Sequence, residues 1–160
     1  MESRRPTTEV LGDLVLVPSC RQQLTELSLD FAVSLRPELP NSDIREDSRS
    51  PFAEAIRLLR ANLKFKDVDS STRSLLVTSP LEAEGKSTIA KNLAFSYTLE
   101  GTKTLLADFD LRRGKVHTAM GCERSPGLSS ILVGESSLEE AVRTVDDLAV
   151  LPTGDLPPNP

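Results

Sequence analysis

Apolar and polar residues in the second half of the chain are arranged in segments typical of alternating strands and helices. Short apolar runs are typical of buried strands, and longer segments with apolar residues three or four apart are typical of helices. Strands that alternate with helices are joined by right-handed crossovers, which predicts an α/β fold with a parallel sheet and helices on both faces. The predicted strands are residues 75–79, 104–108 and 148–151, and the predicted helices are residues 86–100, 128–133 and 137–144.

A further amphipathic helix is predicted upstream, from residue 50 to about residue 65. Ser50 is a preferred helix N-cap, and Pro51 fits the first helical position. One face carries the apolar residues Phe52, Ile56, Leu59 and Leu63. The remaining surface carries Glu54, Arg57 and Arg60. Taken alone, this charged surface favours a solvated helix face with one internal ion pair over an interface.

The first 49 residues are predicted to be a poorly ordered extension and linker, followed by one domain over residues 50–160. The extension contains four prolines and one glycine, and residues 43–49 carry mixed charge with little apolar content. Residues 10–17 could pair as a strand and residues 22–35 could form a short helix, but neither segment has clear punctuation. We assign no function to either segment.

Composition narrows the class of protein. The formal charge of −5 at pH 7 argues against a nucleic-acid-binding protein, which normally shows a strongly basic face. No stretch approaches the roughly 18 apolar residues that a membrane helix needs, and the chain does not begin with a secretory signal pattern. Cys20 and Cys122 are too few and too far apart to indicate a disulfide framework or a metal site. We therefore expect a soluble chain with reduced thiols in the cytoplasm.

Residues 75–88 combine an apolar strand, a tight loop and a helix start that contains Gly85, Lys86, Ser87 and Thr88. A helix start leaves backbone N–H groups unpaired and carries partial positive charge, which suits a phosphate. Lys86 adds a full charge, and a serine hydroxyl at this place can bind Mg²⁺. The segment therefore predicts a nucleotide-phosphate site, with a chance lysine at a helix start as the alternative.

A second motif places Asp108 and Asp110 just beyond another apolar strand. Side chains two residues apart in an extended chain point the same way, so both carboxylates are predicted on one side of a neighbouring strand's end. Such a pair can hold Mg²⁺ directly or through water, and one member can accept a proton from an attacking hydroxyl. The alternative is that one of them caps the next turn or pairs with Arg112 or Arg113.

These motifs, together with two other segments, resemble the bacterial tyrosine kinases that control capsule and exopolysaccharide synthesis and export. That family is related to the deviant phosphate-loop ATPases of chromosome partition and septum placement. The resemblance is carried by residues 50–63, 78–88, 108–117 and 151–160. It implies a P-loop NTPase type of fold and an ATP-dependent protein-tyrosine autokinase.

The resemblance also implies roles for individual residues. The loop around Lys86 corresponds to the Walker A motif, and the acidic segment corresponds to Walker A′. The implied catalytic residues are Lys86, Asp108 and Asp110. The implied ATP-binding residues are Glu84, Gly85, Lys86, Ser87 and Thr88, and the implied Mg²⁺ ligands are Ser87 and Asp108.

Partners and location follow from the same resemblance. Glu54, Arg57 and Arg60 match the family's E-x-x-R-x-x-R pattern, which implies subunit contacts in a ring of copies of the chain. A membrane-embedded polysaccharide co-polymerase is implied as activator, at the inner face of the cell membrane. Nucleic acid is not an expected partner.

The chain departs from the family pattern in three places. Glu82 and Ala83 replace the proline and first glycine of the family's Pro-Gly-Glu-Gly-Lys loop. The family's third motif, an apolar strand ending in aspartate and Pro-Pro, does not occur before Pro160, and Tyr97 is the only tyrosine. We therefore expect a kinase domain that is incomplete at its C-terminus. His117 has a family counterpart, and we assign it no role.

Two other functions are compatible with these departures. A partition or septum-type ATPase would use the same loop to switch dimerisation, although the helix with Glu54 argues against it. A degenerate nucleotide-binding assembly module would explain the altered loop and the missing third motif.

Overall fold

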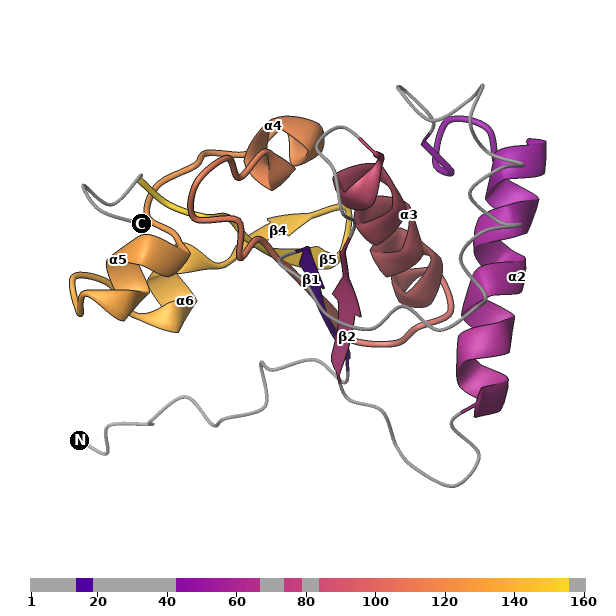
Figure 1. Ribbon diagram of the computed structural model, residues 1–160, viewed down its shortest axis with the longest axis horizontal. Helices are drawn as coiled ribbons and strands as arrows, with labels where there is room; N and C mark the ends of the chain where they lie inside the picture. The colour runs from indigo at the N-terminus through magenta and orange to yellow at the C-terminus, as the bar shows by residue number, and fades with distance from the viewer. Residues whose placement is uncertain (1–13, 19–42, 67–73, 79–83, 156–160) are drawn as a thin grey trace, which may run out of the picture.

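The computed structural model describes residues 14–18, 43–66, 74–78 and 84–155, and of residues 14–18 it describes the backbone (Figure 1). The elements in chain order are β1 (Leu14–Pro18), α2 (Pro51–Lys66), β2 (Ser74–Val77), α3 (Lys86–Thr98), β3 (Thr104–Ala107), α4 (Val116–Met120), α5 (Leu128–Leu132), α6 (Leu138–Ala141), β4 (Arg143–Val145) and β5 (Leu148–Leu151). None of the helices in these ranges is long and apolar enough to cross a bilayer.

The strands form one mixed sheet in the order β2-β1-β3-β5-β4. Strands β2, β1, β3 and β5 are parallel, and β4 is antiparallel to β5, so the prediction of a purely parallel sheet is wrong. The prediction of a helix over residues 137–144 is only partly confirmed. Helix α6 ends at Ala141, and Arg143–Val145 form β4. Asp146 and Asp147, which join β4 to β5, both have positive φ angles, 47° and 64°. Tight hairpins need such angles, and aspartate tolerates them.

Strand β1 lies between the two strands that lead to the predicted motifs. It pairs with β2 on one side and with β3 on the other. The prediction that β2 and β3 are neighbouring strands is therefore wrong. This strand comes from the segment predicted as an extension and overlaps the candidate strand at residues 10–17. The candidate helix at residues 22–35 lies outside the described residues, and the domain boundary at residue 50 stays a prediction.

Two hydrophobic clusters cover the two faces of the sheet. Successive side chains of a strand point to opposite faces, so β3 and β5 contribute to both clusters. Leu106 and Val150 join the larger cluster with α2, α3 and α4. Leu105 and Leu151 join the smaller cluster with α5 and α6. The prediction of helices on both faces of the sheet is therefore confirmed.

Helix α3 packs on the sheet, and α2 packs on the outer side of α3 (Figure 1). Helix α2 begins where the sequence predicts, because Ser50 Oγ accepts a hydrogen bond from the N–H of Ala53 at 3.1 Å. Phe52 and Ile56 on its apolar face are buried. This packing places the start of α3 beside the carboxyl ends of the parallel strands.

Candidate functional site

The first turn of α3 has the features of a phosphate-binding helix start. Gly85 precedes the helix with φ of 88°, a left-handed conformation that glycine adopts without steric cost. Glycine has no side chain that could cap the helix, so the N-cap residue leaves the backbone donors of the first turn to another partner. Lys86 and Ser87 are half-buried in this turn, while Pro80, Glu82 and Ala83 lie outside the described residues.

Asp108 is buried directly after β3, with an exposed fraction of 1%. Its N–H donates to the carbonyl of Leu151 at 2.9 Å, which extends the contact between β3 and β5. Its Oδ1 accepts the N–H of Asp110 at 3.1 Å, and its Oδ2 accepts the N–H of Val116 at 3.0 Å. The carboxylate therefore holds together the loop that runs from Asp108 to α4.

Asp110 is half-buried in the same loop. Its Oδ1 accepts the N–H of Arg112 at 3.2 Å and the N–H of Arg113 at 2.9 Å. This is the turn-capping role that the sequence left open as an alternative. Both acids thus have structural roles in the loop, and their catalytic roles stay predictions.

Sequence reasoning missed two residues that enclose Asp108. A Cβ atom built on Gly114 would lie 1.8 Å from Thr153 Oγ1 and 2.7 Å from Asp108 Oδ2, so only glycine fits this point. Thr153 is completely buried, and its hydroxyl has no hydrogen-bond partner among the described residues. The signal for both was present, because Gly114 lies within the acidic segment and Thr153 lies within the segment that follows the last strand.

The two motifs reach the same edge of the sheet. Lys86 follows β2, Asp108 follows β3, and both strands run parallel to β1 between them. Two strand spacings separate β2 from β3, which is about 10 Å. No group of three or more His, Cys, Asp or Glu side chains in the described ranges is arranged to hold a metal. Mg²⁺ usually keeps several waters and binds one or two carboxylates together with the phosphates of a substrate. The two acids of this loop can provide the carboxylates.

The charged residues of α2 differ in exposure. Glu54 is 75% exposed and pairs with Arg57 at 2.6 Å. The side chain of Arg60 is only 13% exposed, donates to Ser96 Oγ at 2.8 Å and pairs with Glu100. Arg60 therefore joins α2 to α3 within one chain. Glu54 and Arg57 keep the exposure that a subunit contact needs, and the contact itself stays a prediction.

Two further titratable side chains lie in or beside α4, the helix that follows the acidic loop. His117 Nε2 lies 3.1 Å from the hydroxyl of Thr118, and its Nδ1 is buried without a hydrogen-bond partner in the described part of the chain. Burial raises the pKa of the Cys122 thiol, so this thiol remains protonated and weakly nucleophilic at neutral pH.

No protein-family model matches the chain. Its sequence is 43% identical over 116 residues to "Tyrosine-protein kinase YwqD" of Bacillus subtilis (strain 168), a match that covers 71% of the chain and 49% of YwqD. The structure is similar to that of "the chimerical protein CapA2B2", with a TM-score of 0.69 and 33% identity over 80% of the chain and 62% of that protein. It is also similar to "The kinase domain of Escherichia coli tyrosine kinase ETK", with a TM-score of 0.70 and 28% identity over 72% of the chain and 46% of that domain.

The chain spans about half the length of YwqD and of "Putative tyrosine-protein kinase CapB" of Staphylococcus aureus, and 15% of the length of "Tyrosine-protein kinase wzc" of Salmonella typhi. Relatives named tyrosine-protein kinase recur among these matches. Their names favour the kinase interpretation over a partition ATPase or a degenerate assembly module.

Proposed function

Because the chain belongs to the bacterial tyrosine kinases, we propose that it forms the nucleotide-binding part of an ATP-dependent protein-tyrosine autokinase. The observation that carries this proposal is the start of α3, where a left-handed Gly85 leads into Lys86 and Ser87 at the sheet edge that also holds Asp108. The process it regulates is the synthesis and export of capsule or exopolysaccharide, and the fold is of the P-loop NTPase type.

ATP binds with its phosphates at the first turn of α3. The backbone N–H groups of this turn donate to phosphate oxygens, and the helix dipole favours the negative charge. Lys86 donates to the β- and γ-phosphates, and Ser87 Oγ lies beside them. Glu84, Gly85 and Thr88 complete the cradle.

Mg²⁺ fits this site because carboxylate and hydroxyl oxygens are ligands that it accepts, and Asp108, Asp110 and Ser87 supply them. When bound, it would neutralise charge that develops on the phosphates during transfer. Asp108 orients the loop through its two backbone hydrogen bonds. Asp110 orients the backbone of Arg112 and Arg113 through Oδ1, and its carboxylate would bind the metal through water. A carboxylate of this pair accepts the proton of the attacking tyrosine hydroxyl.

The phosphate acceptor lies outside α3. Tyr97 is only 8% exposed in the core of the chain, so its hydroxyl is poorly placed for transfer. Another copy of the chain carries the same buried Tyr97, so the acceptor is a tyrosine that these 160 residues do not include. Glu54 and Arg57 offer an exposed charged surface for contact between copies. A membrane-embedded activator would then place this assembly at the inner face of the cell membrane.

The test is transfer of the γ-phosphate of labelled ATP to a copolymer of glutamate and tyrosine, with Mg²⁺ present. We expect the wild-type chain to label the copolymer. Lys86→Met should lower the rate of labelling about 100-fold, because the phosphate charge that develops in the transition state loses a cationic hydrogen-bond donor. Lys64→Met is the matched control. Lys64 lies near the end of α2 and pairs with Glu100 after the C-terminal end of α3, away from Lys86 at its start. Equal rates for wild type and Lys86→Met would refute the role of the loop.

A further inference from the structure

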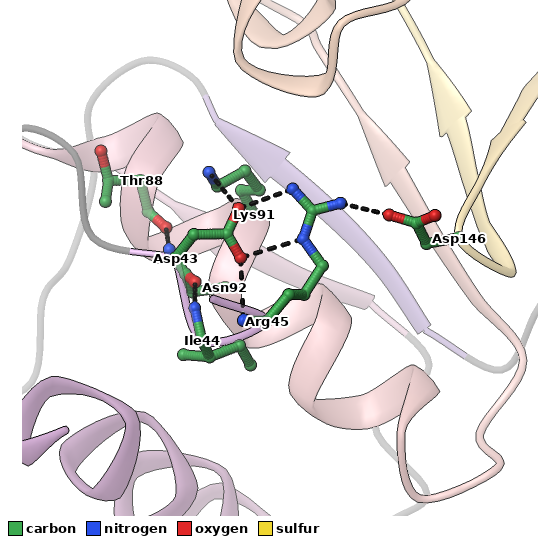
Figure 2. Close-up of polar contacts among 7 residues, drawn as sticks. All are labelled: Asp43, Ile44, Arg45, Thr88, Lys91, Asn92 and Asp146. Atoms are coloured by element: carbon green, nitrogen blue, oxygen red, sulfur yellow. Dashed lines mark hydrogen bonds and ion pairs between the residues drawn. The ribbon is translucent and has the colours of Figure 1, made fainter. Parts of the chain in front are cut away.

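A cluster of charged and polar residues ties the segment before α2 to α3 (Figure 2). We call it the near clasp, and it consists of Asp43, Ile44, Arg45, Lys91 and Asn92. The carboxylate of Asp43 is 6% exposed and pairs with Arg45 at 2.6 Å and with Lys91 at 3.0 Å. The side chain of Asn92 is completely buried, accepts the N–H of Ile44 at 2.8 Å and donates to the carbonyl of Thr88 at 2.8 Å. The near clasp thus reaches the first turn of α3.

The near clasp is held from a second side. The guanidinium of Arg45 stacks 4.1 Å from the centroid of the Phe95 ring on α3. It also pairs with Asp146 in the turn between β4 and β5 (Figure 2). A buried carboxylate between two cations loses much of its freedom to change rotamer, and charge-assisted hydrogen bonds are the strong ones. The near clasp therefore connects α3 to two other parts of the fold.

We propose that the near clasp positions the phosphate-binding start of α3, with Asp43 and Asn92 as positioning residues for nucleotide binding. This inference rests on the proposed function, because it concerns the affinity of the same site. Neither residue touches the nucleotide in this scheme. Each acts through the placement of Lys86, Ser87 and the backbone donors of the first turn.

A second set of contacts at the opposite end of α3 provides the comparison. We call it the far clasp, and it consists of Arg60, Lys64, Ser96 and Glu100. At 1.5 Å per residue, Lys91 lies about 8 Å from Lys86 along the helix axis, and Thr98, the last residue of α3, lies about 18 Å from it. A rotation of α3 by about 3° around the far clasp moves Lys86 by about 1 Å, whereas the same rotation around the near clasp moves it by about 0.4 Å.

These displacements predict unequal effects on the site. Binding sites require their groups within about 0.5 Å of the productive geometry, and a shift of about 1 Å has large effects. When the near clasp is lost, α3 pivots around its distant end and Lys86 moves beyond this tolerance. When the far clasp is lost, the near clasp still holds the first turn in place.

The experiment compares Asp43→Asn with Glu100→Gln in the full chain, each of which removes one carboxylate charge with little change of shape. Affinity is measured by titration with a fluorescent ATP analogue and Mg²⁺, and thermal unfolding is recorded for each variant. Amide hydrogen exchange of residues 86–90 without nucleotide is the second measurement. If Asp43→Asn does not fold, Lys91→Met removes the partner charge at a side chain that is 13% exposed.

We expect Asp43→Asn to weaken nucleotide binding about tenfold and to speed exchange at residues 86–90, while Glu100→Gln changes the affinity less than about twofold. Equal losses of affinity in the two variants, or an unchanged affinity in a folded Asp43→Asn chain, would overturn the inference. If the wild-type chain does not bind the analogue, the proposed function fails. The exchange pattern then decides by itself whether the near clasp holds the start of α3.

Discussion

The two ends of α3 satisfy their backbone groups in different ways. At the far end the chain closes on itself, since the N–H groups of Leu99 and Gly101 donate to the carbonyls of Phe95 and Thr98, each at 2.8 Å. At the near end Gly85 has no side chain to cap the first turn. A helix end that is closed internally serves stability, and a helix end without a side-chain cap suits an anionic ligand. The near clasp supplies at this second end the support that capping does not.

The largest effect is expected at two glycines, Gly114 in the acidic loop and Gly101 after α3. Gly114 packs against Thr153 and Asp108, whereas a Cβ on Gly101 at the far end of α3 would meet nothing within 4 Å. We expect Gly114→Ala to lower the free energy of unfolding by about 3 kcal/mol through overpacking. We expect Gly101→Ala to lower it by about 1 kcal/mol, because the cost there comes only from a positive φ angle. Urea unfolding of both variants measures the difference.

A double variant serves as the control for this mechanism. Thr153→Ala removes the hydroxyl that a Cβ at residue 114 would meet first. Gly114→Ala combined with Thr153→Ala should therefore be less destabilised than the sum of the two single variants. Strict additivity would show that contact with Thr153 is not the source of the loss.

A smaller effect concerns the pH dependence of the two clasps. The hydrogen bond from Arg45 holds the pKa of the Asp43 carboxyl well below its ordinary value of 3.8, against the opposing effect of burial. A carboxylate with a lowered pKa stabilises the fold above its ordinary pKa and loses this contribution as the pH falls. At pH 7 we expect the wild type to exceed Asp43→Asn by about 2 kcal/mol in free energy of unfolding. This difference should shrink as the pH falls below 3.8.

Glu100 in the far clasp should give a weaker pH dependence of the same sign. Its hydrogen bond with Lys64 also lowers the pKa of its carboxyl, but the side chain is 37% exposed, so solvent screens the pair. We expect Glu100→Gln to cost less than about 1 kcal/mol at pH 7. Urea unfolding of both variants between pH 7 and acid conditions tests the order. A larger pH dependence in the far clasp would contradict the contrast between buried and exposed pairs.

The smallest effect is expected on the outer face of α2. Glu54 is 75% exposed and its pair with Arg57 joins residues three apart on one helix, so Glu54→Ala should change the free energy of unfolding by less than about 0.5 kcal/mol. If copies of the chain meet through this face, the same variant should reduce self-association in sedimentation. A loss of stability without any change in association would assign Glu54 to the fold instead.

Several elements were predictable because their signals are local. The N-cap at Ser50, the apolar spacing of α2 and the helix that begins at Lys86 all depend on residues close in sequence. The strand at residues 148–151 is observed with the predicted bounds. Lys86, Asp108 and Asp110 were predicted as site residues because their motifs combine a strand, a turn and residue types that suit phosphate or metal chemistry, and their catalytic roles stay predictions.

Other features depend on contacts between distant residues. Residues 143–145 form a strand instead of the end of a helix because they pair with β5, and pairing across a sheet overrides local preference. Asp43 and Arg45 were interpreted as part of a charged linker, since the sequence does not show that Lys91 and Asn92 lie beside them. Arg60 had the same pattern as Arg57 on the helix, yet only the packing of α2 on α3 shows that it turns inward.

Local sequence patterns predicted the main helices and strands, because hydrophobic periodicity and capping act over a few residues. They also indicated candidate residues for phosphate chemistry, whose roles stay predictions. Only the tertiary structure decided the strand order, the antiparallel edge strand and the two clasps on α3. It also decided that Asp108 closes its own loop under Gly114 and Thr153. These features depend on groups up to about a hundred residues apart, such as Arg45 and Asp146, and a local pattern contains no information on which distant partners will meet.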